Sequence, residues 1–257
     1  MTQITLYTEK SDAILYWTGR FGWLTIPMLA ELVYTYHSQK DALTRRTLNR
    51  LLAEKLVTLS PLNHIRLVTL TPKGIRRVAE QFNVNVYPDR KRFGNPIHRA
   101  VENWRLIDAI TEGFEVYTEH EIYTRSAPVH IFAEKMPDGA IDLGNQHLVW
   151  LEAENAYKSR EERQRIVSFC QKHLNSEDPT PIAPNTYLAR VELVSTNNAA
   201  IKMLIEDILV WHKAKHMGKK QLSLINFSIM EINKQLRRPN LSKNFNLWDD
   251  WIVPRLV

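Results

Sequence analysis

Residues 135–159, KMPDGAIDLGNQHLVWLEAENAYKS, contain the pattern that decides how the second half of the chain is expected to fold. Pro137 and Asp138 stand before one apolar run, and two glutamates, Glu152 and Glu154, stand at the end of the next. Side chains two residues apart in a strand point to the same side, so these glutamates are expected to project together from a strand end. Asp138 is expected to end the preceding strand, and the 13 residues between it and Glu152 allow a hairpin that brings the carboxylates together.

Neighbouring carboxylates repel each other, and a divalent cation is one partner that relieves the repulsion. We expect Mg²⁺ or Mn²⁺ at Asp138 and Glu152, with Glu154 and the Ala153 carbonyl as further ligands. Such an ion would polarise a scissile phosphate and lower the pKa of an attacking water. Lys158, just before an expected helix, has a stem long enough to reach back and stabilise the developing negative charge. The alternative is structural, because Pro-Asp-Gly is a common turn and glutamates at a strand end are usually solvated.

The segments around this stretch alternate between helical and strand patterns. Apolar residues at helical spacing predict helices at 98–110, 159–174 and 198–217. Short alternating runs predict strands at 114–124, 128–142, 146–156 and 186–195. The resulting order, α-β-β-β-α-β, predicts a mixed sheet with helices packed on it. The tail from residue 218 is expected to close the sheet or to form a partner surface.

The excess positive charge of the chain lies in its first third. Residues 1–95 hold 14 lysines and arginines against 7 acidic residues, whereas residues 96–257 hold 20 against 21. Clustered Lys and Arg give proteins their affinity for phosphate backbones, so this distribution predicts a nucleic-acid-binding module joined to a neutral domain. The alternative is a basic surface that only confers solubility.

Residues 11–82 show the order helix, helix, basic helix, β-hairpin, helix, which is typical of a winged helix-turn-helix. Helices are expected at 12–20 and 26–35, followed by a basic helix that Asp41 caps. Residues 57–71 read as a hairpin, and Thr71 with Pro72 begins the last helix.

In a winged helix-turn-helix the third helix lies in the major groove. Its leucines would hold it on the domain, while its polar face would contact DNA through Thr44, Arg45, Arg46, Asn49 and Arg50. The hairpin tip, with His64 and Arg66, would touch the neighbouring backbone. The arginines could instead form a solvated helix face, and winged helices also mediate protein contacts.

The chain is expected to have two domains and no membrane insertion. Residues 84–97, VNVYPDRKRFGNPI, combine two prolines, a glycine and charge, which predicts a linker between domains at 1–83 and 98–257. The single cysteine, Cys170, excludes an internal disulfide and is expected in a helix core. We expect a cytoplasmic bacterial protein, because no signal-peptide pattern and no run of eighteen apolar residues occurs.

Pro137-Asp138 and Glu152-Ala153-Glu154 resemble the PD-(D/E)xK motif of the restriction-endonuclease-like nuclease superfamily. Glu154 stands where that superfamily normally has lysine. Migration of the lysine to the following helix is a known variation there, and Lys158 would be its migrated form. By the same resemblance, Glu102 matches the extra acidic residue that some members use for a metal-bound water. Because Glu154 stands in place of that lysine, two alternatives stay open. Either Glu154 is a third acidic ligand, or the site is degenerate and binds without cutting.

Over about residues 12–217 the chain resembles plasmid replication-relaxation proteins and the MobC-type relaxases of mobilisable plasmids. The resemblance implies a winged helix-turn-helix followed by a restriction-endonuclease-like domain. It also implies nicking of a plasmid transfer origin, with a type IV secretion coupling protein as partner. A homodimer is left open, as is a covalent role for Tyr157. Two alternatives are a non-catalytic plasmid replication or transcription regulator and a restriction or repair endonuclease.

Overall fold

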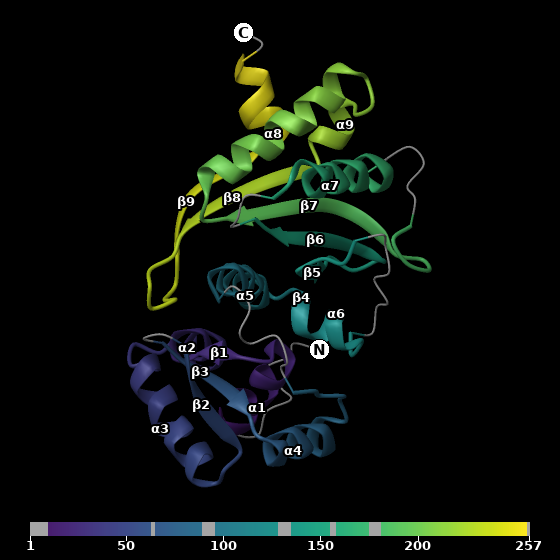
Figure 1. Ribbon diagram of the computed structural model, residues 1–257. Coiled ribbons are helices and arrows are strands. Elements are labelled where there is room, and N and C mark those ends of the chain that lie inside the picture. The colour runs from purple at the N-terminus through teal and green to yellow at the C-terminus, as the bar shows by residue number, and fades with distance from the viewer. Residues whose placement is uncertain are drawn as a thin grey trace.

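The computed structural model describes residues 10–62, 65–88, 96–127, 135–154, 158–174 and 181–255. Over these residues the chain is a mixed α/β protein with two sheets. One is a small antiparallel sheet near the N-terminus, and the other is a mixed six-stranded sheet in the remainder (Figure 1). The expected class, α+β or mixed α/β, is confirmed at that level.

The N-terminal part, residues 10–88, follows the expected order of helix, helix, basic helix, hairpin and helix, with one short strand added. Its elements are α1 (Lys10–Phe21), β1 (Leu24–Thr25), α2 (Ile26–Tyr34), α3 (Lys40–Ala53), β2 (Val57–Leu62), β3 (Ile65–Leu70) and α4 (Pro72–Phe82). The strands form an antiparallel sheet in the order β1-β3-β2. Thr71 caps α4 as expected, because its Oγ1 accepts a hydrogen bond from Gly74 N at 3.1 Å.

The expected cap of α3 is wrong. The helix begins at Lys40, and its N-cap residue Gln39 makes no side-chain capping hydrogen bond. Asp41 lies instead in the first turn, where its carboxylate favours the positive end of the helix dipole. The leucine stripe is confirmed, with Leu48 and Leu51 buried against the N-terminal core.

The remainder of the chain forms the six-stranded sheet and its helices. Its elements are α5 (Pro96–Thr111), β4 (Glu115–Thr118), α6 (Glu119–Thr124), β5 (Gly139–Asp142), β6 (His147–Ala153), α7 (Arg160–His173), β7 (Tyr187–Ser195), α8 (Asn198–Lys213), α9 (Lys219–Leu222), β8 (Ile225–Glu231) and β9 (Asn240–Asn246), followed by a π-helical turn (Leu247–Ile252) and a 3₁₀ turn (Val253–Arg255). The strand order is β4-β5-β6-β7-β8-β9, with β6-β7 and β7-β8 parallel and the other pairs antiparallel. The tail therefore extends the sheet with β8 and β9, which agrees with the expectation that it closes the sheet.

The strand expected at 114–124 is only half correct. Its first residues form β4, but the chain then turns into the short helix α6. Thr118 Oγ1 accepts a hydrogen bond from Glu121 N at 3.1 Å, and Glu121 Oε2 accepts one from Thr118 N at 3.0 Å. This reciprocal capping box starts a helix where the apolar alternation alone continued a strand.

The strand expected at 128–142 is shorter within the residues that the structure describes. Strand β5 begins at Gly139, so Asp138 precedes it rather than ending it. Pro137 has no N–H to donate to a ladder, which explains why pairing starts only after it. The residues at 128–134 lie outside the described part of the chain.

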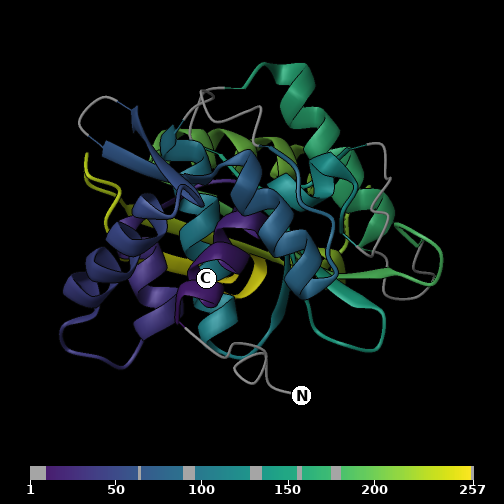
Figure 2. The same cartoon turned by 90° about the horizontal axis from the view of Figure 1, so that it is seen from below.

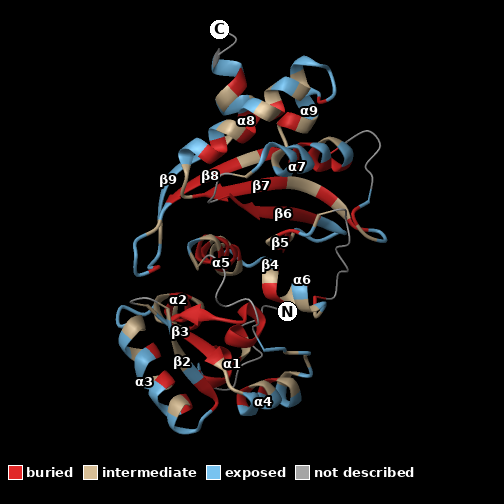
Figure 3. Ribbon diagram, in the orientation of Figure 1, coloured by how far each residue is buried: buried red, intermediate tan, exposed pale blue. Residues whose placement is uncertain are grey.

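Helix α5 lies between the six-stranded sheet and the N-terminal part, and it is buried along much of its length (Figures 1 and 3). It contacts β4, β5, β6 and β7 on one side and α2 on the other. The strands alternate accordingly: Val149 and Leu151 belong to the cluster on the α5 side, and Leu148 and Trp150 to the cluster of α7 and α8. Seen from below, the N-terminal part covers the α5 side of the sheet (Figure 2).

Buried polar contacts hold the N-terminal part to the sheet. Arg20 is 7% exposed. Its Nε lies 2.6 Å from Glu121 Oε1, and its Nη2 donates to the Val116 carbonyl. Thr118 Oγ1 donates to the Arg20 carbonyl at 2.6 Å, and Arg99 Nη2 donates to the Phe21 carbonyl at 2.6 Å. One apolar cluster also runs from α1 through α5 to β8, so the two expected domains share a core.

The expected linker is packed at its start. Val84 and Val86 lie against the N-terminal core, and the Tyr87 carbonyl is 3.0 Å from His120 Nε2. Residues 89–95 lie outside the described part of the chain, and α5 begins at Pro96. Within the described residues, none of the helices combines the length and apolarity that crossing a bilayer requires.

Candidate active site

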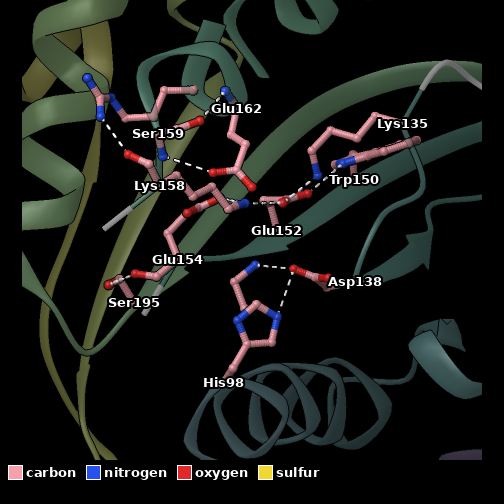
Figure 4. Close-up of polar contacts among 12 residues, drawn as sticks. His98, Lys135, Asp138, Trp150, Glu152, Glu154, Lys158, Ser159, Glu162 and Ser195 are labelled. Carbon is pink, nitrogen blue, oxygen red and sulfur yellow. Dashed lines mark hydrogen bonds and ion pairs between the residues drawn. The ribbon is translucent and has the colours of Figure 1, made fainter. Parts of the chain in front are cut away.

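The beginning of β5 and the end of β6 bring Asp138 beside Glu152 (Figure 4). The strands are antiparallel and Gly139 pairs with Leu151, so Asp138, just before Gly139, lies opposite Glu152, just after Leu151. Asp138 Oδ2 accepts a hydrogen bond from Ala153 N at 2.9 Å. The expected hairpin between these residues is confirmed, although Asp138 precedes its strand, and within the described residues no hydrogen bond joins the two carboxylates to a common partner.

Lys158 reaches back to both glutamates from the start of α7. Its Nζ lies 3.0 Å from Glu152 Oε1 and also binds Glu154 Oε1 (Figure 4). Ser159 caps the helix through Glu162 N, and this places Lys158 one residue before the cap. Glu152 and Glu154 are 2% and 4% exposed, so the ammonium is their counter-charge in a nearly dry environment.

Two residues of the site, Lys135 and His98, were not among the candidates chosen from the sequence. Lys135 Nζ binds Glu152 Oε1, the oxygen that Lys158 also binds. His98 Nε2 lies 3.2 Å from Asp138 Oδ2 and holds that carboxylate from α5. The position of Lys135, three residues before Asp138, was the signal that could have identified it.

The electrostatics of the site follow from burial and these pairs. Burial disfavours the charged forms of Asp138 and His98, but their mutual hydrogen bond and attraction outweigh it, lowering the pKa of Asp138 and raising that of His98. Burial raises the pKa of Glu154 to about 7, with Lys158 opposing the shift and Glu152 adding to it. Burial disfavours the Lys158 ammonium, yet the two glutamates raise its pKa above the usual range.

Glu102 lies apart from these pairs, fully buried on α5. Its Oε1 accepts a hydrogen bond from Glu119 N at 3.1 Å, and its Oε2 has no hydrogen-bond partner among the described residues. Burial, followed by repulsion from Glu119 and Asp138, raises its pKa well above the usual range. Its nearness to Asp138 places Glu102 beside the site, but within the described residues no hydrogen bond or ion pair joins it to Asp138, Glu152 or Lys158.

The carboxylates are the kind of ligand that a hard divalent cation binds, but they are already paired with His98, Lys135 and Lys158. Oxygen ligands are what Mg²⁺ and Mn²⁺ prefer, and Asp138, Glu152 and Glu154 supply them. In the described part of the chain, however, no three His, Cys, Asp or Glu side chains are grouped to hold a metal. An ion at Glu152 would compete with the ammonium groups of Lys135 and Lys158.

The residues expected to contact DNA divide into exposed and buried ones. Arg45, Arg46, Asn49 and Arg66 are exposed, on α3 and β3. Thr44 is 0% exposed, so its expected DNA contact is wrong: it lies four residues before Leu48 and shares that residue's buried side, with its Oγ1 bonded to the Lys40 carbonyl.

Arg50 is exposed and is also tied to the protein. Its Nη2 donates to Ser11 Oγ at 2.7 Å, and its Nε lies 4.0 Å from Glu54. His64 and Tyr157, two further candidates, lie outside the described residues. Cys170 is buried in α7 as expected, and burial raises the pKa of its thiol to about 12.

Comparison of the chain with family models, with curated proteins and with solved structures finds no match.

Proposed function

We propose that the chain is a metal-dependent DNA endonuclease that nicks one strand, acting as a relaxase at a plasmid transfer origin. The observation that supports this proposal is the contact of Lys158 with Glu152 next to Asp138, which the backbone N–H of Ala153 holds at the neighbouring strand end. Acidic ligands next to a lysine are what phosphodiester cleavage requires, because the leaving and attacking oxygens both develop negative charge.

Each residue of the site has a role in this proposal. To hold Mg²⁺ or Mn²⁺, Asp138 and Glu152, with Glu154 as a third ligand, would have to draw together and exchange contacts with His98, Lys135 and Lys158 for the ion. When bound, such an ion polarises the scissile phosphate and lowers the pKa of a water. Lys158 would stabilise the charge that develops on the phosphate. His98 and Ala153 N–H hold the Asp138 carboxylate in one orientation. Glu102, the buried acid beside this group, would help to hold the attacking water.

The N-terminal part would select the DNA as a winged helix-turn-helix. Helix α3 would enter the major groove through Arg45, Arg46, Asn49 and Arg50, and the β2-β3 hairpin, with Arg66, would touch the backbone. The exposure of these side chains supports this role. The transfer origin and the type IV secretion coupling protein, as partners, rest on the family resemblance alone.

A second candidate function, a non-catalytic plasmid replication or transcription regulator, is favoured by one observation. Asp138, Glu152 and Glu154 each have a protein cation as partner. A site that is neutralised in this way can persist as a structural salt-bridge cluster without a metal ion.

Nicking of supercoiled plasmid that carries a candidate origin separates the two functions. Wild-type protein with Mg²⁺ or Mn²⁺ is expected to yield open circles, and chelator is expected to prevent this. Asp138→Asn, Glu152→Gln and Lys158→Ala should each lose nicking and keep origin binding, while Glu206→Gln, an exposed glutamate of α8, should keep both. Unchanged nicking by the three site variants would refute the site, and linear products would favour a restriction or repair endonuclease.

A further inference from the structure

Helix α4 carries a basic outer stripe that is not part of the expected recognition surface of α3. Lys73, Arg76 and Arg77 recur at i, i+3 and i+4 on this helix, and all three are exposed. The inner side of α4 holds the buried Gly74 and Val78. Neither arginine forms an ion pair with any residue that the structure describes. Their charge is therefore available to a ligand.

The start of α4 is fixed against the end of α3. Thr71 N donates to the Leu56 carbonyl at 3.0 Å, and Lys73 Nζ donates to the Glu54 carbonyl at 3.0 Å. Gly74 permits this approach, because a Cβ there would stand 2.0 Å from the Leu56 oxygen. The start of α4 is consequently held next to the chain that leaves α3, at the end of the N-terminal part away from the six-stranded sheet (Figure 1).

Positive charge dominates this combined surface. Arg45 and Arg46 on α3 and Arg66 on β3 are also exposed and make no ion pair within the described residues. Among the described residues, the accessible acids of this region are the half-buried Asp41 on α3, Glu54 just after it and Glu80 on α4. Five unpaired arginines against three acids give this region an excess of positive charge, which attracts a polyanion.

The length of the surface points to a regular polyanion. From Arg45 to the end of α3 at Ala53 the helix rises about 12 Å, at 1.5 Å per residue. Helix α4 begins beside the segment that leaves that end of α3. Duplex DNA carries a phosphate charge about every 1.7 Å along its axis, so a surface of this extent spans more phosphates than one helix can contact.

We propose that Arg76 and Arg77 bind the phosphate backbone of the duplex that α3 reads, so that the footprint extends beyond the recognition helix. Guanidinium groups bind phosphate oxygens with two parallel hydrogen bonds, which suits a fixed backbone contact. This role rests on the proposed DNA binding by α3. It adds affinity that is independent of base sequence, since phosphates position a protein and bases specify it.

The salt dependence of binding to a labelled origin duplex tests this. Each lost phosphate contact reduces the slope of log affinity against log salt by about 0.9, so Arg76→Ala/Arg77→Ala should reduce it by about 1.8. The affinity advantage of the wild type should then shrink about twelvefold between about 50 mM and about 200 mM salt. Arg76→Lys/Arg77→Lys should keep the wild-type slope. Lys202→Ala/Lys213→Ala, which removes two exposed charges from α8, is the control and should also keep it.

The outcomes separate this proposal from the one on which it rests. Undiminished binding by Arg45→Ala/Arg46→Ala overturns the recognition role of α3. A second outcome is that this variant binds weakly while the salt slope of Arg76→Ala/Arg77→Ala equals that of the control. That result overturns the α4 contact alone. If phosphatidylserine vesicles bind the wild type but not the α4 variant, while the duplex slopes agree, the stripe serves a membrane surface and the DNA contact is refuted.

Discussion

Lys158 Nζ lies 3.0 Å from Glu152 Oε1, and the Lys135 ammonium binds the same oxygen. The two lysines differ in their second contacts, because Lys158 also binds Glu154. Both lysines would compete with a metal ion for Glu152, but Lys158 also bridges to Glu154 at the start of α7, whereas Lys135 contacts Glu152 alone among the described residues. Their removal should have different kinetic consequences.

Lys158→Ala should lower the nicking rate at saturating metal by about 10²–10³, the usual loss when one charge-stabilising donor is removed. Lys135→Ala should instead lower the metal concentration that gives half-maximal nicking, because it removes a cation that competes for Glu152. If that competition is worth about 1.4 kcal/mol, the metal-binding equilibrium shifts about tenfold. Metal titrations of nicking time courses measure both. Equal rate losses with unchanged half-saturation in the two variants would contradict the distinction.

Glu102→Gln should stabilise the protein, and more so as the pH rises. Between the ordinary glutamate pKa and the raised pKa of Glu102, the folded state keeps a proton that the unfolded chain has released, so wild-type stability falls across that window. Glutamine keeps an oxygen for the Glu119 N–H and has no titratable proton, so the unfolding free energy of the variant relative to wild type should rise with pH across that window. Urea unfolding at acidic and alkaline pH checks it, and parallel profiles for variant and wild type would refute the explanation.

Arg20→Ala should cost about 3–5 kcal/mol of unfolding free energy, because it leaves the largely buried Glu121 without its cation. Glu121→Gln in the same background should add little, so a double-mutant cycle should give a coupling energy of about 0.5–3 kcal/mol. Lys202→Ala, on the surface of α8, should change stability by less than about 0.5 kcal/mol. An Arg20 variant as stable as this control would show that the interface contact is dispensable.

Gly74→Ala should destabilise the protein by about 1–3 kcal/mol or more, as overpacking does. Its new Cβ would stand 2.0 Å from the backbone oxygen of Leu56, which has no freedom to move as a side chain does. Gly218→Ala is the matched control, since nothing lies within 4 Å of a Cβ there. Thermal melting of both variants compares them, and equal melting temperatures would contradict the close approach of α4 to the Leu56 carbonyl between α3 and β2.

Local patterns in the sequence predicted most helices and strands, and they failed where two local signals compete. The apolar alternation at 114–124 continued a strand, but the Thr118 and Glu121 capping box redirected the chain into α6. Thr44 has a polar side chain at a buried position of the leucine stripe, so its chemistry suggested the wrong face. Both signals are visible in the sequence once their spacing is weighed against residue type.

The candidate site could be predicted where its members are close in sequence. Asp138, Glu152 and Lys158 belong to one hairpin and the helix start that follows it. The contact between His98 and Asp138 depends instead on how α5 packs on the sheet, which no local pattern encodes. The partners of Arg20 in β4 and α6 are of the same kind, because they join segments about a hundred residues apart.

The attachment of the N-terminal part to α5 and α6 has a consequence for the DNA. Rotating that part relative to the sheet would break the contact between Arg20 and Glu121 and expose the shared apolar core. These contacts therefore hold α3 at a fixed distance from Asp138. If the proposed function holds, a duplex that α3 reads and that is cut beside Asp138 must bend to reach both. Bending a site by 40–90° costs about 1–6 kcal/mol and is easiest at pyrimidine–purine steps. Origins with such flexible steps between the two points would be favoured at bases that the protein never touches.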